Sequence, residues 1–209
     1  MTQNLIRTLI ILVLSGCTQT AIAGGMESLE TLSRALRGKE TWRAVYHQVY
    51  LPAGMTIGEK ADGQVWVSWP NRALFISGEP PLRLMGLQGR SVRLLDLEVP
   101  SCDDHELTAE EWASIPLAAV LDPQGAIDEF SVLEHGESGF ALVPRETSGV
   151  NRVTIELGPN NLPKKITITD PQGGTNEMSF SDWQGNETPP DGKWLPTPPK
   201  GLNCVGDLK

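Results

Sequence analysis

Residues 63–75 read GQVWVSWPNRALF, and this stretch decides the fold. Its apolar side chains recur at every second position, the period of a β-strand with two different faces: Val65, Val67 and Trp69, then Ala73 and Phe75. Pro70 lacks an N–H and has a fixed φ, so it interrupts the first strand and marks a bend. The stretch therefore predicts two short strands hinged at residues 69–72.

The same alternation recurs on both sides of this stretch. The expected strands are 41–51, 63–69, 72–77, 81–87 and 91–98, then 129–135, 139–144, 150–157, 164–169 and 176–184. A helix is expected over 26–37, because Leu29, Leu32 and Leu36 form one stripe and Gly38 follows as a C-cap. A sheet of about ten strands curls as its twist accumulates. The fold class is therefore mainly β (α+β), a single domain over 24–209.

The middle of the chain, 103–125, reads as a helical insertion. Thr108 and Glu111 form a capping-box pattern that begins a short helix, and a second helical turn is expected over 117–121, ended by residues 122–125. An insertion between two runs of strands can cover the mouth of a curled sheet. We therefore expect these residues to form a lid.

Composition and motifs exclude several classes of function. The net charge is −9 and no Lys/Arg run occurs, which argues against binding to nucleic acid or anionic lipid. The sequence contains no nucleophile elbow, phosphate-binding loop or zinc-protease motif, and its three histidines lie far apart. We therefore expect no enzyme activity, no cofactor and no metal.

The N-terminus resembles an export signal. One positive charge, Arg7, precedes the apolar run 9–14, which is too short to span a bilayer. Two processing sites compete. Residues 14–17, LSGC, resemble a lipobox that would make residues 1–16 the signal peptide and Cys17 a lipidated N-terminus; residues 21–23, AIA, would instead make it 1–23.

Export also bears on the other two cysteines, Cys102 and Cys204. In an oxidising periplasm they are expected to pair, and the alternative is two free thiols. A bridge closing so long a loop would stabilise the fold by about 4 to 5 kcal/mol in the chain-entropy model.

At this point several stretches together resemble a known family, the LolA-type periplasmic lipoprotein carriers. They occur in the family's order: 63–72, Glu79-Pro80, the helical insertion, 140–144 and 198–202. The resemblance implies an incomplete β-barrel whose concave apolar face, covered by short lid helices, holds the acyl chains of a lipoprotein. It implies three partners: acylated lipoproteins, an inner-membrane exporter and an outer-membrane receptor.

Strand parity and the resemblance together assign side chains to this cavity. The expected acyl-chain wall is Val65, Val67, Trp69, Ala73, Phe75, Leu82, Leu84, Phe140, Leu142, Met178 and Phe180. The expected underside of the lid is Trp112, Ile115, Leu117, Val120 and Leu121. Without the resemblance, such stripes would be interpreted as ordinary core.

The sequence departs from the family pattern at the hinge. Trp69 stands where the family typically has an Arg that holds the lid closed, Ala73 replaces an aromatic residue, and Phe75 stands where a Trp is usual. Three hypotheses stay open: a periplasmic carrier, an acceptor of the LolB type anchored to the outer membrane through Cys17, and a lipid-binding envelope sensor.

Overall fold

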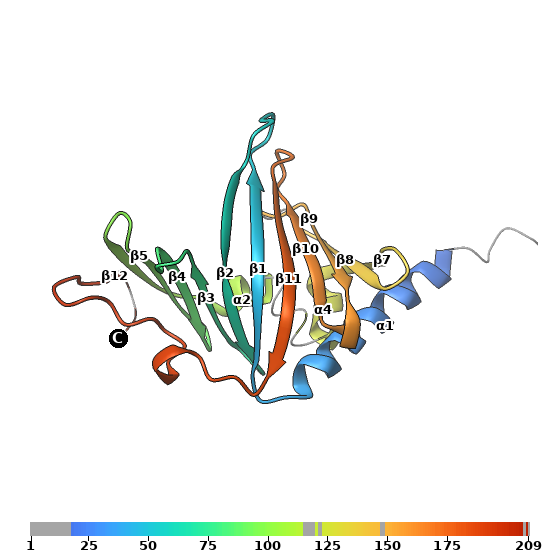
Figure 1. The fold of residues 1–209 in the computed structure, drawn as a ribbon. Coiled ribbons are helices and arrows are strands. Elements are labelled where there is room, and N and C mark those ends of the chain that lie inside the picture. Colours follow the sequence, from blue (N-terminus) through green and yellow to red (C-terminus); the bar gives the residue numbers. More distant parts are fainter. Residues whose placement is uncertain (1–17, 115–119, 121–122, 147–148, 207, 209) are drawn as a thin grey trace, which may run out of the picture.

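The protein is one curled sheet of twelve strands with a long helix beside it (Figure 1). A computed structural model describes residues 18–114, 120, 123–146, 149–206 and 208. The first half contains α1 (Thr18–Arg37), β1 (Trp42–Leu51), β2 (Glu59–Ser68), β3 (Arg72–Ser77), β4 (Arg83–Gln88), β5 (Ser91–Asp96) and β6 (Ser101–Glu106). The second half contains α2 (Ala109–Ser114), α4 (Pro123–Glu129), β7 (Phe130–Glu134), β8 (Gly139–Pro144), β9 (Arg152–Leu157), β10 (Pro163–Thr169), β11 (Thr175–Gly185) and β12 (Val205–Gly206), with 3-10 turns at Pro159–Asn161 and Pro190–Gly192.

Two antiparallel meanders make up the sheet. Strands β1 to β6 are neighbours in sequence order, as are β7 to β11, and pairing of β1 with β11 joins the two runs. Strand β12 adds a short parallel edge to β6. The order runs from β12 to β7, and no pairing among the described residues joins these two ends. The predicted incomplete barrel is therefore confirmed.

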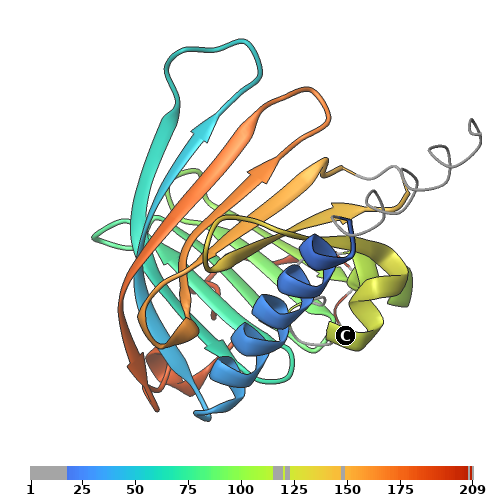
Figure 2. The ribbon, with the colours of Figure 1, turned by 90° about the vertical axis from the view of Figure 1, so that its right-hand side faces the viewer.

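The two faces of the sheet have different covers. We call the face on which α1 packs the inner face; there Leu29 and Leu32 meet Phe140 and Ile155 in the largest buried cluster. Figure 2 shows α1 and α4 lying along this side of the curled sheet. The opposite, outer face carries Trp66 and is covered in part by the C-terminal tail.

Helix α1 ends where the sequence predicted. Its last residue is Arg37, and the Gly38 amide donates to the Ala35 carbonyl at 3.1 Å. The Trp42 indole N–H donates to the Leu36 carbonyl at 3.0 Å, which fastens this end of the helix to β1. The helix therefore lies along the inner face with its C-terminal end held at the start of the sheet.

The tail after β11 crosses the outer face. Trp194 is buried with Trp66 and Leu74, and the tail passes so close to Gly86 that an added Cβ would lie 2.3 Å from the Trp194 carbonyl oxygen. This close approach explains the glycine, since no other residue lacks a Cβ. The tail therefore packs against the outer face of the sheet.

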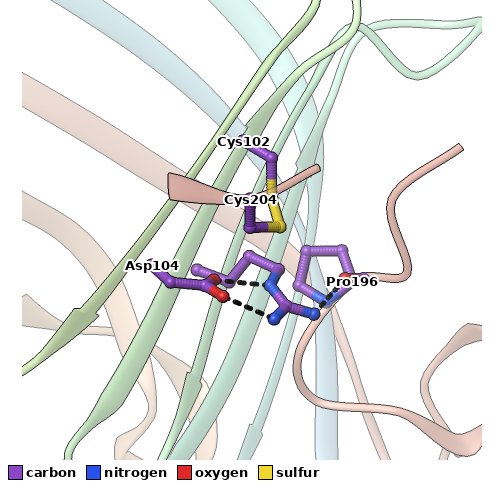
Figure 3. Close-up of a disulfide and its surroundings, with 5 residues drawn as sticks. Cys102, Asp104, Pro196 and Cys204 are labelled. Atoms are coloured by element: carbon purple, nitrogen blue, oxygen red, sulfur yellow. Dashed lines mark hydrogen bonds and ion pairs between the residues drawn. A yellow bond between two sulfur atoms is a disulfide. The ribbon is translucent and has the colours of Figure 1, made fainter. Parts of the chain in front are cut away.

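A disulfide and an ion pair fasten the end of the tail (Figure 3). Cys204 is bonded to Cys102 of β6, with the two Cα atoms 4.4 Å apart. Beside the bridge, Arg93 makes two hydrogen bonds of 2.6 and 2.7 Å to the Asp104 carboxylate and a third, of 3.2 Å, to the Pro196 carbonyl. This contact with Asp104 raises the pKa of Arg93 above its ordinary value.

Two expectations about the middle of the chain were wrong. Residues 103–106, expected to begin the lid insertion, belong to β6; their polar sequence has no period-two pattern, so only pairing with β5 shows the strand. Pro123 was expected to end a helix but begins α4, because a proline at the first helical position loses no hydrogen bond. Among the described residues, no helix combines the length and apolar character needed to span a membrane.

Candidate functional site

A row of apolar side chains crosses the inner face from the centre of the sheet to its β5 side. The register places Ala44 opposite Val65, Val65 opposite Phe75, Phe75 opposite Met85, and Met85 opposite Leu94. Exposure rises along the row, from 1% for Val65 to 39% for Met85 and 47% for Leu94. A second row, in which Val67 lies opposite Ala73, runs alongside it. This half of the inner face is apolar and open.

The other half of the inner face is sealed by α1. Phe140 and Leu142, both predicted to line the cavity, point to the inner face but have no exposed surface, because the α1 leucines pack on them. Their environment is that of a protein core rather than of a surface offered to a ligand. The open half of the inner face, over β2 to β5, is therefore the candidate binding surface.

Aromatic rings bound the candidate surface on its β1–β11 side. Tyr46 and Phe75 meet edge-on with ring centres 5.8 Å apart, and Trp183 lies 5.8 Å from Phe180 and 6.4 Å from Trp42. The Trp183 indole N–H donates to the Pro163 carbonyl at 2.8 Å. Tyr46 is buried, whereas the half-buried rings of Phe75, Phe180 and Trp183 present flat apolar surface, which suits contact with a hydrocarbon chain.

The polar groups on the inner face include a pair of hydroxyls, the Arg83–Asp96 ion pair and the exposed Asp103, which lies opposite Leu94. The hydroxyls of Tyr46 and Ser77 are hydrogen-bonded to each other, and burial raises the pKa of the Tyr46 phenol above its ordinary value. The phenol therefore stays neutral at physiological pH. No described group in this region is arranged as a nucleophile beside a base.

An arginine of α1 lies over the tryptophan in the hinge after β2. Trp69, at the position where the family resemblance expects an Arg, lies under the Arg37 guanidinium, whose carbon is 4.0 Å from the ring centre. The same guanidinium donates to the Ser33 hydroxyl at 3.0 Å. A cation over a Trp face contributes about 0.5 to 1 kcal/mol when exposed. The contact fastens the end of α1 to the rim of the candidate surface.

The predicted lid is described only in part. The capping box is present, with the Thr108 hydroxyl accepting from the Glu111 amide at 3.1 Å and the Glu111 carboxylate accepting from the Thr108 amide at 2.7 Å. These bonds lower the pKa of Glu111 below its ordinary value. Trp112 is half-buried and Val120 is buried in the α1 cluster. Ile115, Leu117 and Leu121 lie outside the described residues.

Two of the predicted wall residues are on the wrong face. Leu84 pairs with Ile76 and Leu95 on the outer face, and Leu82 has the same parity. The turn between β3 and β4 sets the register so that Met85, not Leu84, faces Phe75. Met85 and Leu94 were not predicted, because the sequence does not show which β4 residue lies opposite Phe75. Pairing β3 with β4 residue by residue on either side of a turn at 78–82 would have placed Met85 opposite Phe75.

The remaining predicted wall residues lie on the inner face. Val65 and Ala73 are buried, while Val67, Phe75, Met178 and Phe180 are half-buried. Their contact with a ligand stays a prediction. Cys17, predicted to be lipidated, lies outside the described residues.

One cluster of potential metal ligands occurs among the described residues, formed by Cys102, Asp104 and Cys204. The two sulfurs are joined to each other, and the Asp104 carboxylate is held by Arg93. A disulfide offers no thiolate to a metal ion, so the cluster has a structural role in this state.

The sequence of the chain also matches a family profile. The profile described as "Outer membrane lipoprotein carrier protein LolA" matches residues 37–196. The chain belongs to the LolA family. The matched segment begins at the end of α1 and covers β1 to β11, and so includes every strand of the candidate surface.

Curated relatives agree in length and name. A protein of Xanthomonas campestris pv. campestris named outer-membrane lipoprotein carrier protein is 25% identical over 197 residues, 91% of this chain and 92% of the relative. A protein of Pseudomonas putida with the same name is 23% identical over 206 residues, 96% of this chain and 98% of the relative.

Solved structures are more distant. A LolA superfamily protein from Nitrosomonas europaea has a TM-score of 0.42 and 10% identity, covering 80% of this chain and 96% of the other. Lipoprotein LppX of Mycobacterium tuberculosis has a TM-score of 0.39 and 10% identity, covering 80% and 98%. At these TM-scores the likeness supports no functional conclusion.

Proposed function

We propose that the chain is a periplasmic carrier that holds the acyl chains of lipoproteins against the open half of its inner face and passes them towards the outer membrane. The observation that carries the proposal is the apolar row ending in Met85 and Leu94, two large side chains left exposed on the inner face. Membership of the LolA family and the relatives' printed name support it.

Energetics favour such a ligand. Each buried CH₂ group contributes about 0.8 kcal/mol, so covering the apolar row with an acyl chain stabilises a complex without any polar anchor. Release then needs only a change that uncovers the row, and no covalent chemistry. The proposed partners are therefore acylated lipoproteins, an inner-membrane exporter and an outer-membrane receptor.

The test compares two glutamate variants in protein purified from its own periplasm. Met85→Glu places a charge on the candidate surface and is expected to abolish retention of triacylated polypeptide in native mass spectrometry. Val99→Glu is the matched control, because Val99 is also exposed but lies in the turn after β5. Retained cargo in a folded Met85→Glu protein would refute the binding surface, as would equal loss of cargo in Val99→Glu.

A membrane-anchored acceptor of the LolB type is a second candidate. It is favoured by the lipobox-like residues 14–17 and by Trp69, which replaces the expected Arg. Mass spectrometry of the mature N-terminus separates the two. A chain that begins at Gly24 excludes the anchor, whereas a diacylated Cys17 excludes a freely diffusing carrier.

A further inference from the structure

Strand β2 has a free edge over its first residues. Its pairing with β1 begins at Glu59, whereas its pairing with β3 begins only at Gly63. The last contact is a bond of 2.9 Å from the Gly78 amide to the Asp62 carbonyl. Each residue of an antiparallel strand directs its N–H and C=O to one neighbouring strand, and the next residue directs both groups to the other neighbour. Lys60 and Asp62, two residues apart, therefore face the same side. Lys60 therefore directs its N–H and C=O away from β1, where no described residue pairs with them.

A groove of about 1140 Å³ lies along this free edge and takes its lining from both faces of the sheet. Glu59 and Arg83 share the inner-face parity of Val65 and Met85, whereas Asp62 shares the outer-face parity of Trp66. The lining includes Trp66 and Ile76, which belong to the apolar cluster of the outer face, and the exposed side chains of Tyr50 and Leu82. The Trp66 indole N–H has no hydrogen-bond partner in the described part of the chain. The groove therefore combines apolar surface with an unpaired strand edge, beside a buried donor that is unsatisfied.

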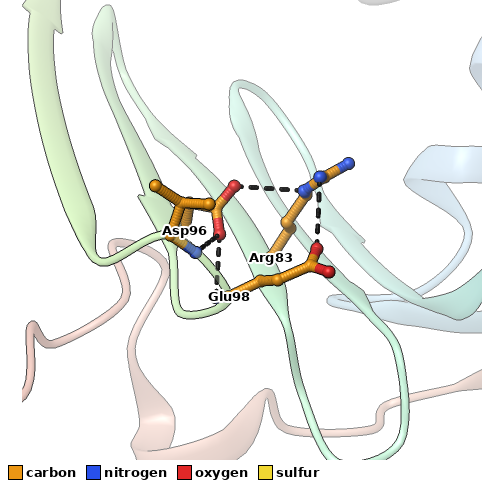
Figure 4. A network of polar contacts seen from close by, with 4 residues as sticks. Arg83, Asp96 and Glu98 are labelled. Atoms are coloured by element: carbon orange, nitrogen blue, oxygen red, sulfur yellow. Dashed lines mark hydrogen bonds and ion pairs between the residues drawn. The ribbon is translucent and has the colours of Figure 1, made fainter.

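The charges around the groove are mainly negative. Two cations and four carboxylates line it: Lys60, Arg83, Glu59, Asp62, Glu79 and Glu98. Figure 4 shows that Arg83 is already occupied, because it bonds to Asp96 at 3.1 Å and to Glu98 at 3.3 Å. Glu98 is thereby paired too, and Asp62 lies 2.7 Å from the His47 imidazole, so Glu59 and Glu79 are the carboxylates that favour a cationic occupant.

We propose that this groove binds an extended polypeptide segment of alternating basic and apolar residues, which adds to the free edge of β2 at Lys60. A strand edge offers a donor and an acceptor at the spacing of a peptide backbone, and β-strand addition is a recurring mode of peptide recognition. Alternation would direct apolar side chains to Trp66 on the outer face and basic ones to Glu59 on the other face.

The occupant is the polypeptide part of the bound lipoprotein, so this assignment rests on the proposed function. Strand β2 carries Val65 on the inner face and Lys60 at the groove, only five residues apart along one strand. That separation is about 17 Å at the rise of an extended strand. A linker of about five residues therefore reaches from the acyl chains to the groove.

The first experiment uses unlipidated probes, so that its outcome does not depend on the acyl-chain surface. A fluorescently labelled peptide Ac-SKVKIKT-amide is titrated with the full protein and followed by anisotropy, beside the acidic counterpart Ac-SEVEIET-amide. We expect saturable binding of the basic peptide, weakened by salt, and at least tenfold weaker binding of the acidic peptide. Equal binding of both peptides, or binding of neither, would overturn the proposal.

Variants locate the binding. Lys60→Pro removes the free N–H but no ladder bond to β1, and it should reduce affinity at least tenfold. Glu59→Lys reverses one exposed charge without disturbing packing and should weaken binding severalfold. It therefore tests the groove independently of whether the proline variant folds. Glu137→Lys, an equal charge change in the turn before β8, is the matched control and should bind like the unmodified protein. Unchanged affinity in Glu59→Lys and in folded Lys60→Pro would place the peptide elsewhere.

The source of the peptide is tested with an acylated form of the same basic sequence, carrying a five-residue spacer. Its affinity should exceed that of the free peptide at least tenfold and fall with either Lys60→Pro or Met85→Glu, since both sites act on one molecule. If Met85→Glu alone lowers its affinity, the groove does not serve the cargo. If the free peptide binds but acyl retention is absent, the carrier function fails while the groove stands as a peptide site.

Discussion

Reducing the disulfide between Cys102 and Cys204 should lower stability through the unfolded state. The two residues are 102 positions apart. In the chain-entropy model, closing a loop of about 100 residues stabilises the fold by about 4.7 kcal/mol at 25 °C. Folded-state contacts of the tail are independent of the bridge, because Arg93 holds Pro196 and Trp194 is buried against Trp66. We therefore expect a reduced protein that is folded but less stable.

The assay is urea unfolding of the oxidised and reduced protein, followed by tryptophan fluorescence. Reduction leaves both sulfurs in place, so no cavity contributes to the difference, unlike the substitution Cys102→Ala at a buried position. The expected loss is about 3 to 5 kcal/mol, with a larger m-value for reduced protein because its unfolded chain is more expanded. A loss below about 1 kcal/mol with native-like near-UV circular dichroism would refute the cross-link argument.

Three further predictions concern the two faces of the sheet. Phe140→Ala should cost about 3 to 5 kcal/mol in thermal or urea unfolding, since the side chain is fully buried under α1; a cost below about 1 kcal/mol would show that the site is open. Gly86→Val should displace the tail from Trp194, detected as faster proteolysis within the tail; unchanged proteolysis would contradict the close approach. Because the folded pKa of Tyr46 is raised, stability should be complete below about pH 10 and fall at higher pH. Tyr46→Phe should flatten that fall, and an identical pH profile would exclude Tyr46 as its source.

Much of the strand pattern could be predicted from residues alone. Strands β3 and β8 begin and end where the alternation predicts, because their apolar and polar side chains face different environments. Strand β6 was missed because Cys102, Asp104 and their neighbours carry no apolar alternation. It is held by pairing with β5 and by contacts from the tail, which are distant in sequence.

The candidate surface was predictable only in part, for a related reason. Parity placed Val65 and Val67 of β2 correctly on the inner face, and it carried across the short hinge to Phe75 of β3, but it failed across the longer turn between β3 and β4. A shift of one residue exchanged Leu84 for Met85. The departure at Trp69 was visible in the sequence, whereas the guanidinium that covers it comes from Arg37 and needed the fold to be seen.

The sequence by itself determined the curled sheet, the helix that precedes it and the family resemblance, because these follow from periodicity and from the order of short motifs. Only the tertiary structure decided which apolar side chains are core and which are offered to a ligand. Burial depends on what packs against a face, and α1 covers Phe140 while leaving Leu94 exposed. Two residues with the same parity and similar hydrophobicity therefore differ in role through a neighbour that no local pattern specifies.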